Sequence, residues 1–153
     1  MEGSRKAMLI QVENVYKHYV QPKTTVEVLR GVYLAIAAKE MVAIVGPSGA
    51  GKSTLLHLIG GLDRPTQGAI RCCGVELGHL HDRALADFRN LRIGFVFQFH
   101  HLLPEFSALE NTMMPALIQR RAKREAQREA RHLLVSVGLG DRLHHRPGEL
   151  SGG

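Results

Sequence analysis

The chain has 153 residues, of which 44% are hydrophobic and 22% charged, an ordinary composition for one modest globular domain and unlike that of a disordered chain. Aromatic residues make up only 5% and Trp is absent, so a surface on which several nucleic-acid bases stack is not expected. The net charge of +6 suits a polyanionic partner, such as a nucleotide, a nucleic acid or an acidic membrane face.

Much of the positive charge lies between Arg120 and Arg131, in a stretch whose apolar residues recur at the spacing of a helix. Glu125 and Glu129 stand three or four residues from several of these cations, so ion pairs can form along the helix face. The pattern favours a solvated helix face, with binding of phosphate or lipid headgroups as the alternative.

The sequence shows no sign of an oxidising compartment or of a membrane span. Its only cysteines, Cys72 and Cys73, are adjacent, a spacing that rarely gives a disulfide and does not match a zinc site. We find no signal-peptide pattern, and the best apolar run, 31–46, is interrupted by Lys39 and Glu40. If the protein works at a membrane, we expect another chain to supply the span.

Taken in chain order, the first part of the sequence is rich in predicted strands. Apolar alternation or short apolar runs predict strands near 10–12, 32–36, 41–45, 69–73 and 93–97. The run at 41–45 is continuous and partly β-branched, so we expect a strand buried on both faces. Helices are predicted over 52–59, closed by Gly60 and Gly61, and over 82–91.

Helices follow one another after Phe106. One is predicted over 107–118, with Pro115 as a kink or break, and the next over 121–137. The expected fold class is therefore α/β. We expect a division into a core, 1–97, and a helical part, 98–153.

The segment from Gly46 to Ser53 matches G-x-x-x-x-G-K-[ST], the phosphate loop of P-loop NTPases, and it stands between an apolar run and a predicted helix. Glycines let backbone N–H groups approach phosphates that side chains would obstruct, and the helix directs its positive end at the anion. The predicted nucleotide-binding residues are Gly46, Pro47, Ser48, Gly49, Ala50, Gly51, Lys52, Ser53 and Thr54. The alternative is a Gly-rich turn that caps a helix.

Within this loop the side chains have separate expected roles. Lys52 should reach the β- and γ-phosphates, Ser53 should bind Mg²⁺, and Thr54 should bond to the α-phosphate of ATP. The motif by itself leaves kinases, GTPases, motor ATPases and transport ATPases open.

Three further features favour the transport ATPases. The segment Leu150-Ser151-Gly152-Gly153 resembles the signature motif of ABC transporters, Gln98 resembles their Q-loop glutamine, and Tyr19 resembles the A-loop aromatic that stacks on adenine. Separately, these could be a helix cap, a polar strand end and a surface aromatic. In this order around a phosphate loop, they identify the chain as similar to the ABC ATPases.

The stretch after Gln98 resembles one branch of that family, the lipoprotein-releasing ATPases. The similar segments are 97–104, Phe106, 108–111, 114–115, 145–147 and 149–153, together with 55–58 and 60–63. The resemblance extends from about Met8 to Gly153. Macrolide exporters and cell-division ATPases share the core motifs and are the alternatives.

The resemblance implies an ABC-type nucleotide-binding domain, with a mixed sheet and a helical signalling subdomain. ATP and Mg²⁺ are the implied ligands, with Lys52 and Gln98 in catalysis and Ser53 and Gln98 at the metal. Adenine would stack on the ring of Tyr19, so Phe should serve there nearly as well as Tyr. In the family, two subunits meet head to tail, and Ser151, Gly152 and Gly153 close on the nucleotide of the partner.

The implied partners are a second ATP-binding subunit and integral membrane permease subunits, at the cytoplasmic face of the bacterial inner membrane. Nucleic acid is not an expected partner, because no groove-reading motif accompanies the charge. The histidine pairs lack a carboxylate or cysteine at zinc spacing, and His100 and His101 are expected to line the groove for the membrane partner.

The sequence departs from the family pattern in two respects. Lys39 stands before Glu40, where the family usually has Gly. The Walker B strand, its Mg²⁺-bound Asp and catalytic Glu, the D-loop and the switch His do not follow the signature within these 153 residues. A nucleotide-binding fragment without turnover is therefore an alternative. We expect 41–45 to keep unpaired backbone groups on one side and to destabilise the chain.

Overall fold

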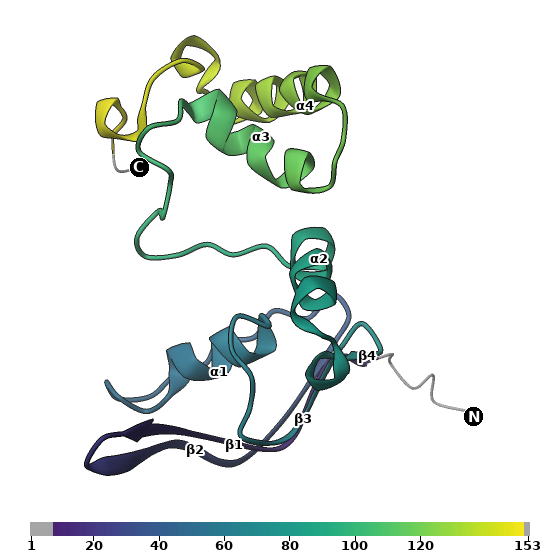
Figure 1. Cartoon of the computed structure of the whole chain (residues 1–153), viewed down its shortest axis with the longest axis vertical. Helices are drawn as coiled ribbons and strands as arrows, with labels where there is room; N and C mark the ends of the chain where they lie inside the picture. The colour runs from purple at the N-terminus through teal and green to yellow at the C-terminus, as the bar shows by residue number, and fades with distance from the viewer. Residues whose placement is uncertain (1–7, 152–153) are drawn as a thin grey trace. The chain divides into compact units, whose positions relative to one another are not determined.

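The computed structural model describes residues 8–151 and divides into two compact units, one extending to Arg89 and the other beginning at Asn90 (Figure 1). Each unit has a hydrophobic core of its own. The division expected after residue 97 is based on functional motifs and stays a prediction.

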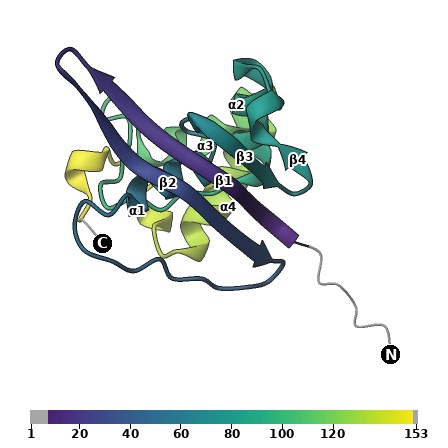
Figure 2. The ribbon, with the colours of Figure 1, turned by 90° about the horizontal axis from the view of Figure 1, so that it is seen from below.

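The first unit contains a four-stranded sheet in the order β2-β1-β3-β4, in which every neighbouring pair is antiparallel. The bounds are Met8–Gln21 for β1, Thr24–Ala37 for β2, Gln67–Cys72 for β3 and Val75–Glu76 for β4. Figure 2 shows these strands side by side, with the long β1–β2 hairpin at one edge. The strands predicted near 10–12, 32–36 and 69–73 are confirmed.

Helix α1, Lys52–Ile59, contacts β2 and β3 and forms the core with them. Its apolar residues Leu55, Leu58 and Ile59 recur at i, i+3 and i+4, so they line one face. This face meets Val12 and Val15 of β1, and Val15 is completely buried. Burial of each large aliphatic side chain stabilises the unit by about 1.5–3 kcal/mol. The sheet therefore holds α1 firmly.

The short 3-10 helix η1, Leu77–His79, and helix α2, Asp82–Arg92, follow the sheet. Leu77 and Leu85 join the core of the first unit. Arg64 fastens this part by donating to the carbonyls of Gly78 and Leu80. The helix predicted over 82–91 is confirmed.

The predictions of strands at 41–45 and 93–97 are wrong for the part of the chain that the structure describes. Both segments are irregular, and neither pairs with a strand among residues 8–151. Met41 is 98% exposed and Val45 87%, although Ile44 still packs against the core. Apolar composition favours burial, but a strand also needs a neighbouring chain to accept and donate its backbone hydrogen bonds. The described sheet is accordingly antiparallel throughout and not mixed.

The second unit consists of helices α3, Ala108–Ile118, and α4, Lys123–Ser136, with the 3-10 helices η2, Gly140–Arg142, and η3, Pro147–Glu149. A capping box begins α3, in which Ser107 Oγ accepts from the Glu110 N–H and the Glu110 carboxylate accepts from the Ser107 N–H. The helix continues through Pro115 without a break.

Small residues allow α3 and α4 to pack closely. Ala126 and Ala130 of α4 are almost fully buried, against Leu109 and Met113 of α3. None of the helices within residues 8–151 is both long and apolar enough to cross a bilayer.

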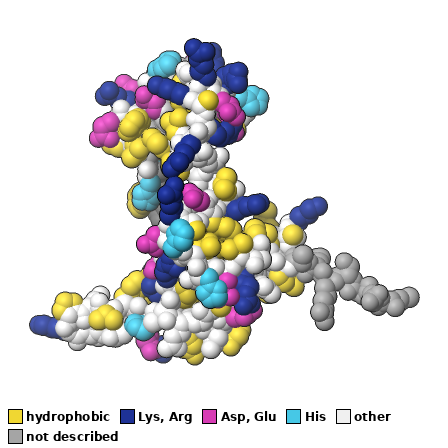
Figure 3. Space-filling view, turned by 45° about the vertical axis from the view of Figure 1, so that its right-hand side comes forward, with side chains coloured by type: hydrophobic (Ala, Val, Ile, Leu, Met, Phe, Trp, Pro, Cys, Tyr) yellow, Lys and Arg dark blue, Asp and Glu magenta, His cyan; other side chains and the backbone are white. Residues whose placement is uncertain are grey.

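The basic run of α4 forms a solvated helix face. Arg121 makes ion pairs with Glu125 and Glu129. Figure 3 shows Lys, Arg, Asp and Glu side chains interspersed over the helices of this unit, without a large region of a single sign. Exposed pairs of this kind add little stability.

Candidate nucleotide-binding site

The phosphate loop lies between 45 and the first residue of α1, and its glycines adopt conformations that other residues avoid. Gly49 and Gly51 have φ angles of +80° and +84°. Gly51 is also the N-cap of α1 and lies against β2. A Cβ at this position would be 2.8 Å from Leu29 Cδ2 and 3.0 Å from the Val28 carbonyl oxygen. Gly51 therefore lets the loop approach the sheet as well as turn.

Lys52 folds back over the loop. Its Nζ donates hydrogen bonds to the carbonyl oxygens of Gly46, at 2.9 Å, and Pro47, at 2.6 Å. These bonds hold the ammonium group where the loop curves, although the group stays exposed to solvent. A phosphate oxygen entering the loop would meet a positioned cation.

The start of α1 adds backbone donors to this cation. The first turn of a helix has N–H groups without intrahelical acceptors, and here no side chain caps them. The first turn also holds no acidic residue that would neutralise the positive end of the helix dipole. The loop, Lys52 and the helix end together make a site suited to a phosphate chain.

Tyr19 lies on β1 beside residues that follow α1. Its hydroxyl donates to Asp63 Oδ2 at 2.9 Å, and Lys17 Nζ lies 4.7 Å from the centre of its ring. Partial burial and the neighbouring Asp63 carboxylate raise the pKa of Tyr19, and the smaller opposing effect of the Thr54 side chain does not cancel this rise. The predicted aromatic thus lies in the same unit as the phosphate loop.

Asp63 is the centre of this cluster. Lys17 Nζ donates to Asp63 Oδ1 at 2.7 Å, and the Arg64 backbone N–H donates to the same oxygen at 2.7 Å. Partial burial acts to raise the pKa of Asp63, but hydrogen bonds from Lys17, Arg64 and Tyr19 outweigh it and lower the pKa below 3.8. Asp63 is ionised at neutral pH.

The other predicted site residues belong to the second unit. Gln98 and Ser151 are exposed, and Gly152 and Gly153 lie outside the described residues. The ring of Phe97 stacks on Phe95 and meets His101 edge-on, with centroids 5.1 and 5.0 Å apart. The participation of Gln98 and of the signature residues in the nucleotide site stays a prediction.

The second unit also has pockets of its own. One of about 420 Å³ brings the segment after Gln98 together with the signature segment. Its lining residues are His100, Leu102, Leu139, Arg142, Pro147, Glu149, Leu150 and Ser151.

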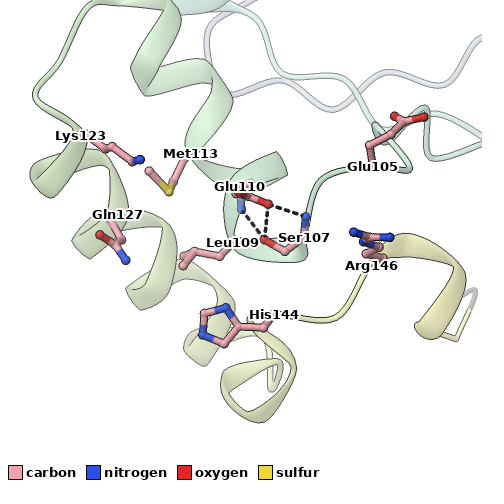
Figure 4. Close-up of a pocket in the computed structure, with 9 residues that line it drawn as sticks. All are labelled: Glu105, Ser107, Leu109, Glu110, Met113, Lys123, Gln127, His144 and Arg146. Atoms are coloured by element: carbon pink, nitrogen blue, oxygen red, sulfur yellow. Dashed lines mark hydrogen bonds between the residues drawn. The ribbon is translucent and has the colours of Figure 1, made fainter.

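Another pocket, of about 410 Å³, surrounds the capping box of α3 and is shown in Figure 4. Glu110 points toward Ser107 there, and the Ser107 backbone and side-chain hydrogen bonds lower the pKa of Glu110. The polar groups of Ser107 and Glu110 therefore satisfy one another.

The chemistry of the phosphate loop fits Mg²⁺ together with a nucleotide. Mg²⁺ usually takes one or two protein oxygens and fills its other positions with phosphates and water. Ser53 offers an exposed hydroxyl in the first turn of α1. Residues 8–151 contain no group of three or more His, Cys, Asp or Glu side chains that could hold a metal by themselves.

Comparison with known proteins identifies the family. The family described as "ABC transporter" matches residues 29–153. This chain belongs to the ABC transporter family. The predicted resemblance is confirmed, and the matched range of this ABC protein includes the phosphate loop, Gln98 and the signature segment.

Curated relatives point to one branch of the family. This ABC protein is 57% identical over 145 residues to the "Lipoprotein-releasing system ATP-binding protein LolD" of Geobacter metallireducens, a match covering 95% of this chain and 64% of the relative. It is 52% identical over 147 residues to the LolD protein of Acinetobacter baylyi, again covering 95% of this chain and 64% of the relative. The chain thus spans less than two thirds of the length of these relatives.

Solved structures confirm the fold class. A dimeric ATP-binding cassette in a post-hydrolysis state with ADP and Pi superposes with a TM-score of 0.85 at 37% identity, covering 94% of this chain and 63% of that one. A dimeric bacterial ABC transporter cassette gives a TM-score of 0.84 at the same identity and coverage. The chain has the α/β fold of ABC-type nucleotide-binding domains.

Sequence reasoning did not single out Lys17 or Asp63 as functional. A signal for Lys17 was present, because Val15, Lys17 and Tyr19 alternate along β1 and must share one face. A lysine in line with a buried valine needs a counter-ion. No local pattern indicates that Asp63 supplies it.

Proposed function

We propose that this chain is the ATP-binding part of an ABC complex that releases lipoproteins from the bacterial inner membrane. The observation that carries the proposal is the phosphate loop, where Lys52 Nζ is bonded to two loop carbonyls beside an uncapped helix start. The identity of 57% to a relative named as a lipoprotein-releasing ATP-binding protein supports the branch.

In this proposal, the chain binds ATP with Mg²⁺ through its own loop. Lys52 exchanges the carbonyls of Gly46 and Pro47 for the β- and γ-phosphates, and the N–H groups of the first turn of α1 surround the phosphate chain. Ser53, joined by Gln98, holds Mg²⁺. The base stacks on Tyr19, and Ser151 of a second copy closes on the γ-phosphate.

The proposed partners follow from this arrangement. A second ATP-binding subunit completes each site, since signature residues act in trans in the family. Integral membrane permease subunits dock on the segment after Gln98, where Phe99, Leu102 and Leu103 are exposed. The complex works at the cytoplasmic face of the inner membrane, and ATP turnover there drives lipoprotein release.

The 153-residue polypeptide by itself is proposed to bind ATP without hydrolysing it. Phosphoryl transfer to water requires a group that orients the water, in addition to a cation at the phosphates. Lys52 supplies the cation, but no acidic pair follows an apolar strand in this sequence. Mg²⁺-dependent ATP turnover by the purified chain that disappears in Lys52→Ala would contradict this.

Titration of ATP against Lys52→Ala tests nucleotide binding. Loss of a charge-assisted bond should weaken binding by about ten- to a hundredfold. Lys23→Ala, which removes the same charge from the exposed β1–β2 turn, is the matched control and should bind ATP normally. Equal affinities of Lys52→Ala and the control would show that the loop is not the phosphate site.

A chimera tests the lipoprotein branch. This chain would replace the corresponding residues of the Geobacter metallireducens relative, so that the rest of that protein is present. The chimera should support lipoprotein release from inner-membrane vesicles together with the membrane subunits of the relative. An ATPase-active chimera that leaves lipoproteins in the membrane would favour another branch of the family.

A further inference from the structure

One face of β1 contains an almost buried lysine between a buried valine and the aromatic residue at the nucleotide site. Val15, Lys17 and Tyr19 share this face, and their exposed fractions rise from 0% through 9% to 40%. The face therefore runs from the core of the first unit to the position proposed for the base. Lys17 stands at the transition.

The charge of Lys17 is fully paired. Its Nζ donates to Asp63 Oδ1 at 2.7 Å and to the Arg64 carbonyl oxygen at 2.8 Å, and it lies over the ring of Tyr19. A lysine whose side chain is only 11% exposed would be costly without such partners. The ammonium group therefore stays in one place and shields one face of the Tyr19 ring.

The carboxylate of Asp63 is equally constrained. Oδ1 accepts from Lys17 and from the Arg64 N–H, which leaves Oδ2 to accept from the Tyr19 hydroxyl at 2.9 Å. Asp63 follows the turn that closes α1, and α1 begins at Lys52 of the phosphate loop. One rigid helix thus links the phosphate-binding residues to the carboxylate that holds the ring.

We propose that Asp63, held by Lys17, is a positioning residue that fixes the orientation of the Tyr19 ring so that the base of the nucleotide can stack on it. This rests on the proposed ATP-binding function. The Lys17 ammonium group covers one face of the Tyr19 ring, and the bond from the Tyr19 hydroxyl to Asp63 holds the ring in one orientation. A base can therefore stack only on the other, exposed face of the ring. Pre-orienting the ring removes the entropy cost of ordering it when nucleotide binds.

The proposal changes the expectation for a Phe at this position. If only the ring face mattered, Tyr19→Phe would bind ATP normally. With the hydroxyl bonded to Asp63, Tyr19→Phe loses the positioning bond while the Lys17–Asp63 pair stays intact. This substitution therefore isolates orientation from stacking.

The test compares two ligands in the intact chain, Mg-ATP and Mg-tripolyphosphate, by titration calorimetry. Tripolyphosphate has the phosphates without the base, so it reports the loop alone. Tyr19→Phe and Asp63→Asn should each weaken the binding of ATP by about three- to tenfold and leave the affinity for tripolyphosphate unchanged. In the double variant the losses should not add, because both substitutions act on the same bond. Phe removes its hydroxyl donor, and Asn removes the carboxylate charge that strengthens its acceptor.

Asp87→Asn is the matched control for charge, because Asp87 is an exposed carboxylate on α2. It should bind both ligands as the unsubstituted chain does. Thermal unfolding of each variant reports stability separately, and Tyr19→Phe keeps the test valid if Asp63→Asn unfolds with its lysine unpaired.

The outcomes separate this inference from the proposed function. If the substitutions weaken the binding of ATP and of tripolyphosphate equally, the contacts among Lys17, Asp63 and Tyr19 have only a structural role. If Tyr19→Phe binds ATP normally while Tyr19→Ala binds it weakly, the ring stacks on the base without needing to be positioned. Either result overturns the inference but leaves the phosphate loop in place. An unsubstituted chain that binds neither ligand would overturn the proposed function itself.

Discussion

The close approach of Gly51 to β2 leads to a quantitative prediction for Gly51→Ala. The added Cβ would be 2.8 Å from Leu29 Cδ2, 3.0 Å from the Val28 oxygen and 3.2 Å from Val28 Cγ1. The nearest of these distances is below what real Cβ atoms show, and the oxygen belongs to a paired strand. The phosphate loop or β2 must therefore move.

Two costs add in this substitution. A φ of +84° costs an alanine about 1–2 kcal/mol, and overpacking against the strand costs about 1–3 kcal/mol more. The sum of about 2–5 kcal/mol corresponds to a fall in melting temperature of roughly 4–20 °C for a chain of this size. The displaced loop should also bind ATP less tightly, because the N–H groups at the start of α1 move with it.

Gly74→Ala is the control for backbone strain. Gly74 has a φ of +77° in the same unit, but nothing lies within 4 Å of the Cβ that would be added. Only the strain cost of about 1–2 kcal/mol remains, with unchanged ATP affinity. Differential scanning calorimetry and ATP titration measure both effects. If Gly51→Ala and Gly74→Ala lose the same stability and bind ATP equally, the close packing of Gly51 on β2 contributes neither to stability nor to nucleotide binding.

The remaining predictions concern the capping box, the ion pair and the partner surface. Ser107→Ala should lower the free energy of unfolding by about 1 kcal/mol in urea, and an unchanged midpoint would contradict the capping role. Because the pKa of Asp63 is lower in the folded chain than in the unfolded chain, its ionised carboxylate stabilises the fold when the pH is above the unfolded-state pKa. The difference in free energy of unfolding between the wild type and Asp63→Asn should therefore become smaller as pH falls below about 4. A gap that widens in acid would reverse that sign. In the chimera with the Geobacter metallireducens relative, His101→Cys or Leu103→Cys should crosslink to the membrane subunits. Crosslinks only from cysteines placed on α4 would show that the membrane subunits dock on a different face.

Local rules explain which parts of the fold could be predicted. The helix at 52–59 is confirmed at both ends, because its apolar spacing and the two glycines after it are signals within one short segment. The helices on either side of Arg120 follow from the same kind of signal.

The mistaken strands show where such rules stop. The runs at 41–45 and 93–97 have the composition of buried strands, and among residues 8–151 they have no ladder partner. Hydrophobic pattern specifies which side chains favour burial. It does not specify whether another strand lies alongside to satisfy the backbone.

The sequence by itself determined the phosphate-loop motif, which depends on residue types at short fixed spacings, and the order of the ABC motifs along the chain, which identifies the family. Only the tertiary structure decided that Gly51 packs on β2 and that the Tyr19 hydroxyl bonds to Asp63. These contacts join residues that are far apart in the chain and meet because α1 packs across the sheet. Their energies depend on distance and burial, which the folded chain alone sets.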